Sequence, residues 1–84
     1  MRLDELPLDQ PAIITGIDWA MLGEGSARRL RALGFETGVM VEALHKGVFW
    51  WRDPIAIRVG RMTIALRKAQ AAAIAVSVVE VAVA

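Results

Sequence analysis

The sequence predicts an all-β fold: a small closed barrel of five short strands with one inserted helix. Two observations lead to this prediction. Apolar and polar residues alternate over several short segments, as they do in strands with one buried face. A two-residue turn that begins with glycine separates two of these segments, which is typical of a hairpin. A chain of 84 residues fits one domain, so we expect residues 1–84 to fold as one unit.

The first strand is expected at residues 12–17. The segment Ala-Ile-Ile-Thr-Gly-Ile is short, rich in β-branched residues, and lies between Pro11 and the polar Asp18. Such a segment, bounded by residues that favour turns, is typical of a strand.

A short amphipathic helix is expected over residues 26–33. It follows the turn-forming segment Gly23-Glu24-Gly25. Ser26 is placed to cap the first turn, because a serine hydroxyl accepts a hydrogen bond from an otherwise unpaired amide. Three apolar residues recur at helical spacing and predict the buried face: Ala27, Leu30 and Leu33. Gly34 then stands where a helix often ends with a positive φ.

The remaining elements follow from the change to a period of two. Three strands are expected, each with apolar residues alternating along it: Val39, Val41 and Ala43; Ile55, Ile57 and Val59; Met62, Ile64 and Leu66. The pair Gly60-Arg61 between the last two predicts a type II′ turn. Residues 67–73 favour a helical turn, and residues 74–83 form the closing strand. Barrel closure would remove the exposed edges that a flat sheet would leave.

Composition argues against several functional classes. The chain has no cysteine, which leaves no thiolate metal site and no cysteine nucleophile. His45 is the single histidine, and no nucleophile, base and orienting group can be assembled around it. We therefore expect no enzyme activity, no cofactor and no metal site. The apolar stretch 69–84 is shorter than the roughly 20 residues that span a bilayer, so we expect a soluble protein without membrane insertion.

Arg28, Arg29 and Arg31 form the one concentrated basic cluster. It is either a solvated helix face or a contact surface for an acidic partner protein. Nucleic acid is a weaker candidate for this cluster. The net charge is only +1, whereas nucleic-acid binders usually carry a larger basic surplus, and no aromatic residues alternate with the arginines.

Phe49, Trp50 and Trp51 are three consecutive aromatic residues in the expected loop between the second and third strands. Three neighbouring rings in a loop cannot all point inward, and tryptophan is frequent among binding hot spots. The sequence leaves two interpretations open. The rings either cover the mouth of a small core or anchor a partner protein.

The order of these features resembles the FeoA family, whose members accompany the ferrous iron transporter FeoB. The matching pairs are Arg29-Leu30, Leu33-Gly34, Gly38-Val39, Asp53-Pro54 and Leu66-Arg67. Thr37 stands where the family pattern has proline, and Arg52 where it has glycine. The matches run through almost the whole chain and fall mostly on glycines and apolar residues.

The resemblance implies an SH3-like barrel and a role in ferrous iron uptake. The protein would be a cytoplasmic, non-enzymatic accessory protein of ferrous iron uptake that docks on the cytoplasmic GTPase part of FeoB. In that interpretation Arg28, Arg29 and Arg31 are electrostatic contacts, and residues 49–51 are apolar anchors. Two alternatives stay open: a small nucleic-acid-binding or transcription-regulator barrel, and a structural module that self-associates through its weakly charged last strand.

Overall fold

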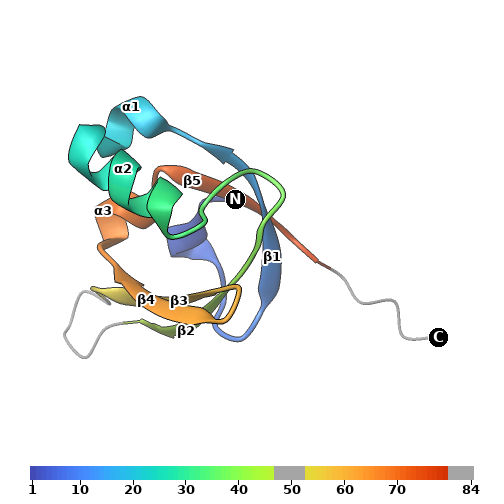
Figure 1. The fold of residues 1–84 in the computed structure, drawn as a ribbon. Helices are drawn as coiled ribbons and strands as arrows, with labels where there is room; N and C mark the ends of the chain where they lie inside the picture. Colours follow the sequence, from blue (N-terminus) through green and yellow to red (C-terminus); the bar gives the residue numbers. More distant parts are fainter. Residues whose placement is uncertain (47–52, 80–84) are drawn as a thin grey trace.

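The computed structural model describes residues 1–46 and 53–79 of the chain. Its elements, in chain order, are η1 (Leu3–Glu5), β1 (Pro11–Ile17), α1 (Trp19–Leu22), α2 (Glu24–Ala32), β2 (Met40–Lys46), β3 (Ile55–Val59), β4 (Met62–Leu66), α3 (Lys68–Ala71) and β5 (Ile74–Val78). The predicted all-β fold is confirmed, since the strands form one five-stranded sheet with short helices packed against it (Figure 1). The predicted closure is incomplete in the described residues, because β4 and β5 end the sheet and do not pair with each other.

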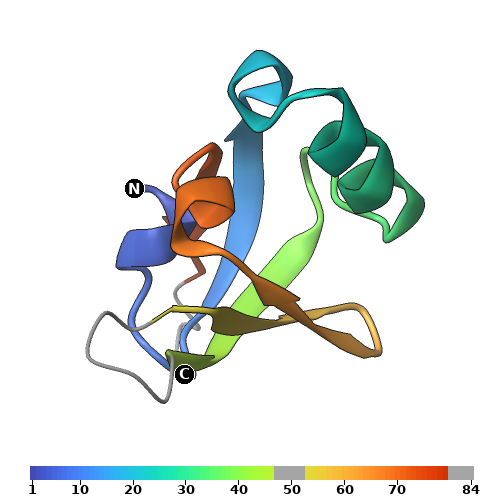
Figure 2. The same ribbon diagram turned by 90° about the vertical axis from the view of Figure 1, so that its left-hand side faces the viewer.

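The sheet is antiparallel throughout, with the strand order β4-β3-β2-β1-β5. It curls strongly, and η1 and α3 lie side by side on its inner side (Figures 1 and 2). Irregularities in register occur between Ile14 and Gly16 in β1 and between Ala43 and His45 in β2. Such bulges bend a strand and help a small sheet to curve.

The core lies inside this curved sheet. The strands contribute alternate residues, such as Ile55, Ile57 and Val59 of β3, as the period of two predicts. Leu3 and Leu6 from the η1 segment, and Leu30 from α2, are completely buried among them. Helices and sheet therefore share one core, and α2 is part of the folded unit.

The β3–β4 hairpin matches its prediction closely. Val59 pairs with Met62 across the two-residue turn. Gly60 has φ +59°, whereas Arg61 does not have a positive φ. A type I′ turn needs a positive φ at both central residues and a type II′ turn only at the first, so the geometry fits type II′.

The other predicted boundaries shift by small amounts. β1 begins at Pro11, one residue before the predicted strand, and α3 lies within the predicted helical turn. β5 ends at Val78, and the end of the predicted run to Val83 falls outside the described residues. Met1 and Arg2 pair with the outer edge of β5 at Val76 and Ala75.

The predicted helix is present, but it begins at Glu24, and the predicted serine cap is wrong. Gly23 occupies the cap position with φ +82°. Ser26 lies inside α2, where its hydroxyl accepts a 3.1 Å hydrogen bond from the side-chain amide of Gln70 in α3. The glycines around Glu24 suggested a turn because glycine is a poor helix former, yet here the helix includes Gly25.

A second helix, α1, precedes α2 and was not predicted. Asp18 caps it, since its carboxylate accepts a 3.0 Å hydrogen bond from the backbone N–H of Met21. Four residues are too few for a helical period to show in the sequence. Within residues 1–46 and 53–79, no helix has the length and apolar character needed to cross a bilayer.

Candidate partner-binding site

The two helices α1 and α2 form a corner at one end of the barrel (Figures 1 and 2). Gly23 connects them, and its positive φ allows the sharp change of direction. Ala27 and Leu30 bury one side of α2 against the core. Trp19 of α1 is half-buried and also packs on the core.

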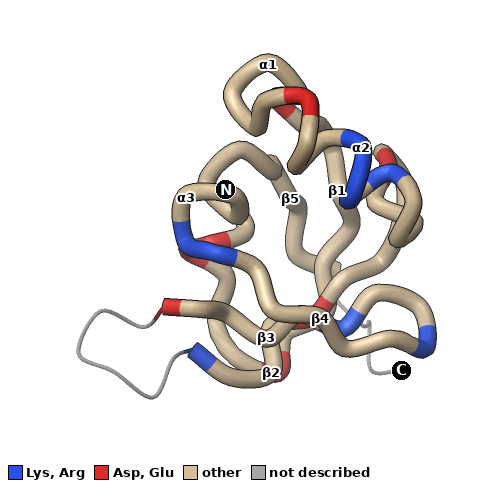
Figure 3. Tube along the Cα trace, turned by 60° about the vertical axis from the view of Figure 1, so that its left-hand side comes forward, with Lys and Arg blue, Asp and Glu red and all other residues tan. Residues whose placement is uncertain are grey.

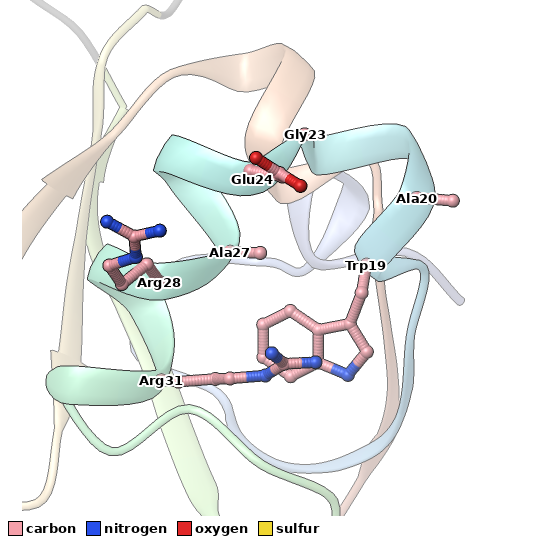
Figure 4. A pocket seen from close by; sticks show the side chains of 7 residues that line it. All are labelled: Trp19, Ala20, Gly23, Glu24, Ala27, Arg28 and Arg31. Carbon is pink, nitrogen blue, oxygen red and sulfur yellow. The ribbon is translucent and has the colours of Figure 1, made fainter.

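A groove of about 530 Å³ lies between the two helices. Its lining, shown in Figure 4, consists of Trp19, Ala20, Gly23, Glu24, Ala27, Arg28 and Arg31. Small residues and one indole ring make up its apolar part, and three charged side chains surround them. A groove that combines apolar residues with charged groups can bind a partner that presents both kinds of side chain.

Arg31 crosses the groove to Trp19. Its guanidinium carbon lies 4.3 Å from the centroid of the indole ring (Figure 4). This is a cation–π contact, which contributes on the order of 0.5–1 kcal/mol at an exposed site. Arg28, by contrast, points away from the ring in Figure 4.

A second hollow of about 650 Å³ borders the same contact. Trp19 and Arg31 line it together with Phe35, Glu36 and Thr37. The Trp19–Arg31 pair therefore lines both hollows. A partner seated in either hollow would meet Arg31.

The predicted arginine cluster is only partly brought together. Arg28, Arg29 and Arg31 are all exposed on α2, and Figure 3 shows the basic positions along this helix. Arg28 and Arg31 line the groove, whereas Arg29 does not. In the described part of the chain none of the three forms an ion pair; the arginines that do are Arg2, Arg58 and Arg67. The cluster thus presents unneutralised positive charge.

Phe49, Trp50 and Trp51 lie outside the described residues, and their role stays a prediction. The residues that flank this segment are fixed to the barrel. Lys46 Nζ donates a 3.3 Å hydrogen bond to the carbonyl of Asp4. Asp53 Oδ1 accepts a 2.9 Å hydrogen bond from the backbone N–H of Lys68. These flanks lie at the opposite end of the molecule from the α1–α2 corner (Figures 1 and 3).

The described side chains offer no metal-binding cluster, since no three His, Asp or Glu residues converge within residues 1–46 and 53–79. His45 is exposed on β2. Glu42, three residues earlier, pairs with Arg58 at 3.2 Å.

Trp19 is the site residue that sequence reasoning missed. The signal that could have found it is local: Asp18, a good cap residue, stands directly before Trp-Ala-Met-Leu, and Gly23 follows. Its contact with Arg31 depends on the angle between two helices, which the sequence does not show.

A family model described as the FeoA domain matches residues 1–78. A search of curated protein sequences found no match. Among solved structures, FeoA from Chlorobium tepidum has a TM-score of 0.82 and 26% identity, covering 95% of this chain and 71% of that chain.

Two further solved structures are more similar to this chain in sequence than the Chlorobium tepidum protein is. Iron(II) transport protein A from Clostridium thermocellum has a TM-score of 0.78 and 32% identity, covering 94% of this chain and 46% of that chain. FeoA from Stenotrophomonas maltophilia has a TM-score of 0.75 and 35% identity, covering 92% of this chain and 89% of that chain. That protein is described as a zinc-complexed prokaryotic SH3 domain protein and is suggested to be a ferrous iron transport activating factor.

Proposed function

This chain belongs to the FeoA family, and from that premise we propose that it is a non-enzymatic accessory protein of ferrous iron uptake that docks on the cytoplasmic part of FeoB. The family is linked to ferrous iron transport, and the fold is SH3-like. Fold alone does not fix function. The docking proposal therefore also rests on the surface described above.

The observation that carries the proposal is the α1–α2 groove. It combines an apolar floor with arginines that pair with no carboxylate in the described residues. Protein interfaces favour this combination, because a buried apolar anchor contributes most of the affinity while charges at the rim accelerate association. A catalytic site would need a nucleophile or a base in the groove, and its lining offers only one carboxylate, Glu24.

Docking on this surface would affect transport if the protein binds one state of the transporter more tightly than another. A protein that binds one state of a transporter more tightly than another shifts the equilibrium toward that state. We propose that the chain acts in the cytoplasm in this way, without a cofactor, by binding one state of the GTP-driven cycle of FeoB. Phe49, Trp50 and Trp51 remain a second predicted contact.

The test is a titration of the full-length protein against the isolated cytoplasmic part of its cognate FeoB, by calorimetry, with and without a GTP analogue. Saturable binding supports the proposal. Absence of binding up to high micromolar concentration in both nucleotide states would contradict it. Trp50→Ala and Trp51→Ala weaken the binding if the predicted aromatic contact exists.

A parallel titration with a single-stranded oligonucleotide tests the alternative function. Tight binding that falls steeply with salt would indicate a nucleic-acid-binding barrel instead. We expect no such binding, because Glu24 borders the same groove as Arg28 and Arg31 and repels phosphate.

A further inference from the structure

We propose that Arg31, held on the Trp19 ring, is the residue that recognises the partner, and that it binds a carboxylate flanked by an apolar side chain which fills the groove. This inference rests on the proposed docking function and specifies its chemistry. The partner segment would present an Asp or Glu side chain beside a residue such as Leu or Phe.

Arg31 is positioned on the Trp19 ring before any partner binds. Its guanidinium lies over the indole at 4.3 Å from the ring centroid. A guanidinium that lies over a ring has its ring side occupied, while its N–H groups that point away from the ring remain free to donate. A carboxylate accepts two such N–H groups in parallel, the geometry that distinguishes arginine from lysine. Because the ring restricts the side chain before binding, less conformational entropy is lost in the complex.

The charge of Arg31 also favours an acidic partner. Arg31 has no carboxylate partner among residues 1–46 and 53–79, although Glu24 and Glu36 border the two hollows on either side of it. The donors are therefore available to a partner. The neighbouring Arg28, which is also unpaired in that part of the chain, adds positive potential at the same rim.

The groove beside Arg31 has room for an apolar side chain of the partner. Ala20, Gly23 and Ala27 leave it open beside the Trp19 ring (Figure 4). Its volume of about 530 Å³ is ample for one large apolar side chain. An extended nucleic-acid backbone fits less well, because each of the two hollows that Arg31 lines also contains a carboxylate, Glu24 or Glu36, which repels phosphate.

The test compares Arg31→Glu and Arg31→Lys with Arg61→Glu in the same titration against the cytoplasmic part of FeoB. Arg61 is a matched control, since it is exposed in the β3–β4 turn, forms no ion pair with a described residue and lines neither hollow. Arg31→Glu should raise Kd by about tenfold or more, as expected for a central arginine contact. Arg31→Lys should also weaken binding, because lysine keeps the charge and loses the two-pronged geometry. The Kd of Arg61→Glu should stay within about twofold of the wild-type Kd.

The outcomes separate this inference from the proposed function. If the wild-type protein does not bind, the docking function fails. If the wild type binds and Arg31→Glu binds within twofold of it, the docking function survives and the role of Arg31 is refuted. If Arg31→Lys binds as well as the wild type while Arg31→Glu does not, the contact is a general charge effect, and recognition by the stacked guanidinium is refuted. Circular dichroism of each variant confirms that the fold is intact.

Discussion

The side-chain amide of Gln70 donates a 3.1 Å hydrogen bond to the hydroxyl of Ser26, and this bond joins α3 to α2 across 44 positions of the chain. Both side chains are half-buried. The bond fixes α2, which carries the arginine cluster, to the side of the barrel where α3 and η1 lie. It therefore ties the candidate site to α3.

Ser26→Ala removes this bond and should lower the free energy of unfolding by about 0.5–1.5 kcal/mol, the usual net contribution of one intramolecular hydrogen bond. Urea denaturation measures the effect. Ser77→Ala is the control, because Ser77 is exposed in β5 and its side chain makes no hydrogen bond within the described residues. If Ser26→Ala and Ser77→Ala lower the free energy of unfolding equally, the contact with Gln70 contributes nothing to stability.

Replacement of two glycines by alanine should change the stability of the protein in opposite directions. Gly25 lies in α2, and Gly25→Ala should stabilise the protein by about 0.5–1 kcal/mol, because alanine is the better helix former. Gly60 has φ +59° in the β3–β4 turn, and Gly60→Ala should destabilise it by about 1–2 kcal/mol. A Cβ meets no atom within 4 Å at either position, so only the backbone differs. Thermal denaturation that shifts both variants the same way would contradict this account.

Asp53 holds the start of α3 through its carboxylate, which accepts from the backbone N–H of Lys68 at 2.9 Å. Asp53→Ala should cost about 1 kcal/mol, the typical loss when a helix cap is removed. Asp53→Asn keeps an acceptor oxygen and should retain most of the stability. If urea denaturation gives the same loss for both variants, the carboxylate acts by charge on Arg67, 3.9 Å away, and not as a cap.

Glu5 should make stability depend on pH in the acid range. The backbone N–H of Arg2 donates to its carboxylate at 3.0 Å, and this bond, with the nearby positive charges of Arg2 and the amino terminus, lowers the pKa of Glu5 from its ordinary 4.5. A lowered pKa in the folded state stabilises the protein above the ordinary pKa, and that contribution is lost as pH falls through the folded value.

The measurement for Glu5 is the unfolding free energy of wild type and Glu5→Gln between pH 7 and pH 3. The wild type should be the more stable at pH 7, and the difference should shrink below about pH 4.5. Glu36→Gln serves as control, since the Glu36 side chain accepts no hydrogen bond from a described residue. A constant difference across the range would refute the pH effect.

Much of the fold could be predicted because the strands obey a simple rule. Val41, Ala43, Ile55, Ile57 and Val59 are buried where the period of two places them. The hairpin at Gly60 followed from its residue types, since only a few two-residue turns match the twist of paired strands. These features depend on neighbours in the sequence, and therefore the sequence shows them.

The α1–α2 corner could not be predicted to the same degree. Gly23 and Gly25 indicated a turn on intrinsic preference, but only Gly23 breaks the helix, with φ +82°, while packing of Ala27 and Leu30 on the core stabilises the rest. Tertiary packing outweighs a helix propensity difference of about 1 kcal/mol. The contact between Trp19 and Arg31 arises from that same packing, so the arginines were found and their aromatic partner was not.

The most direct test of the central claim is a nitrogen-15 NMR titration of the labelled protein with the cytoplasmic part of FeoB. The three tryptophans each give one indole signal, which single Trp→Phe variants assign. We predict that the Trp19 indole signal and the amide signals of residues 19–31 move on binding, while those of the β3–β4 turn around Gly60 do not. Binding that leaves the Trp19 signal and residues 19–31 unchanged would contradict the account.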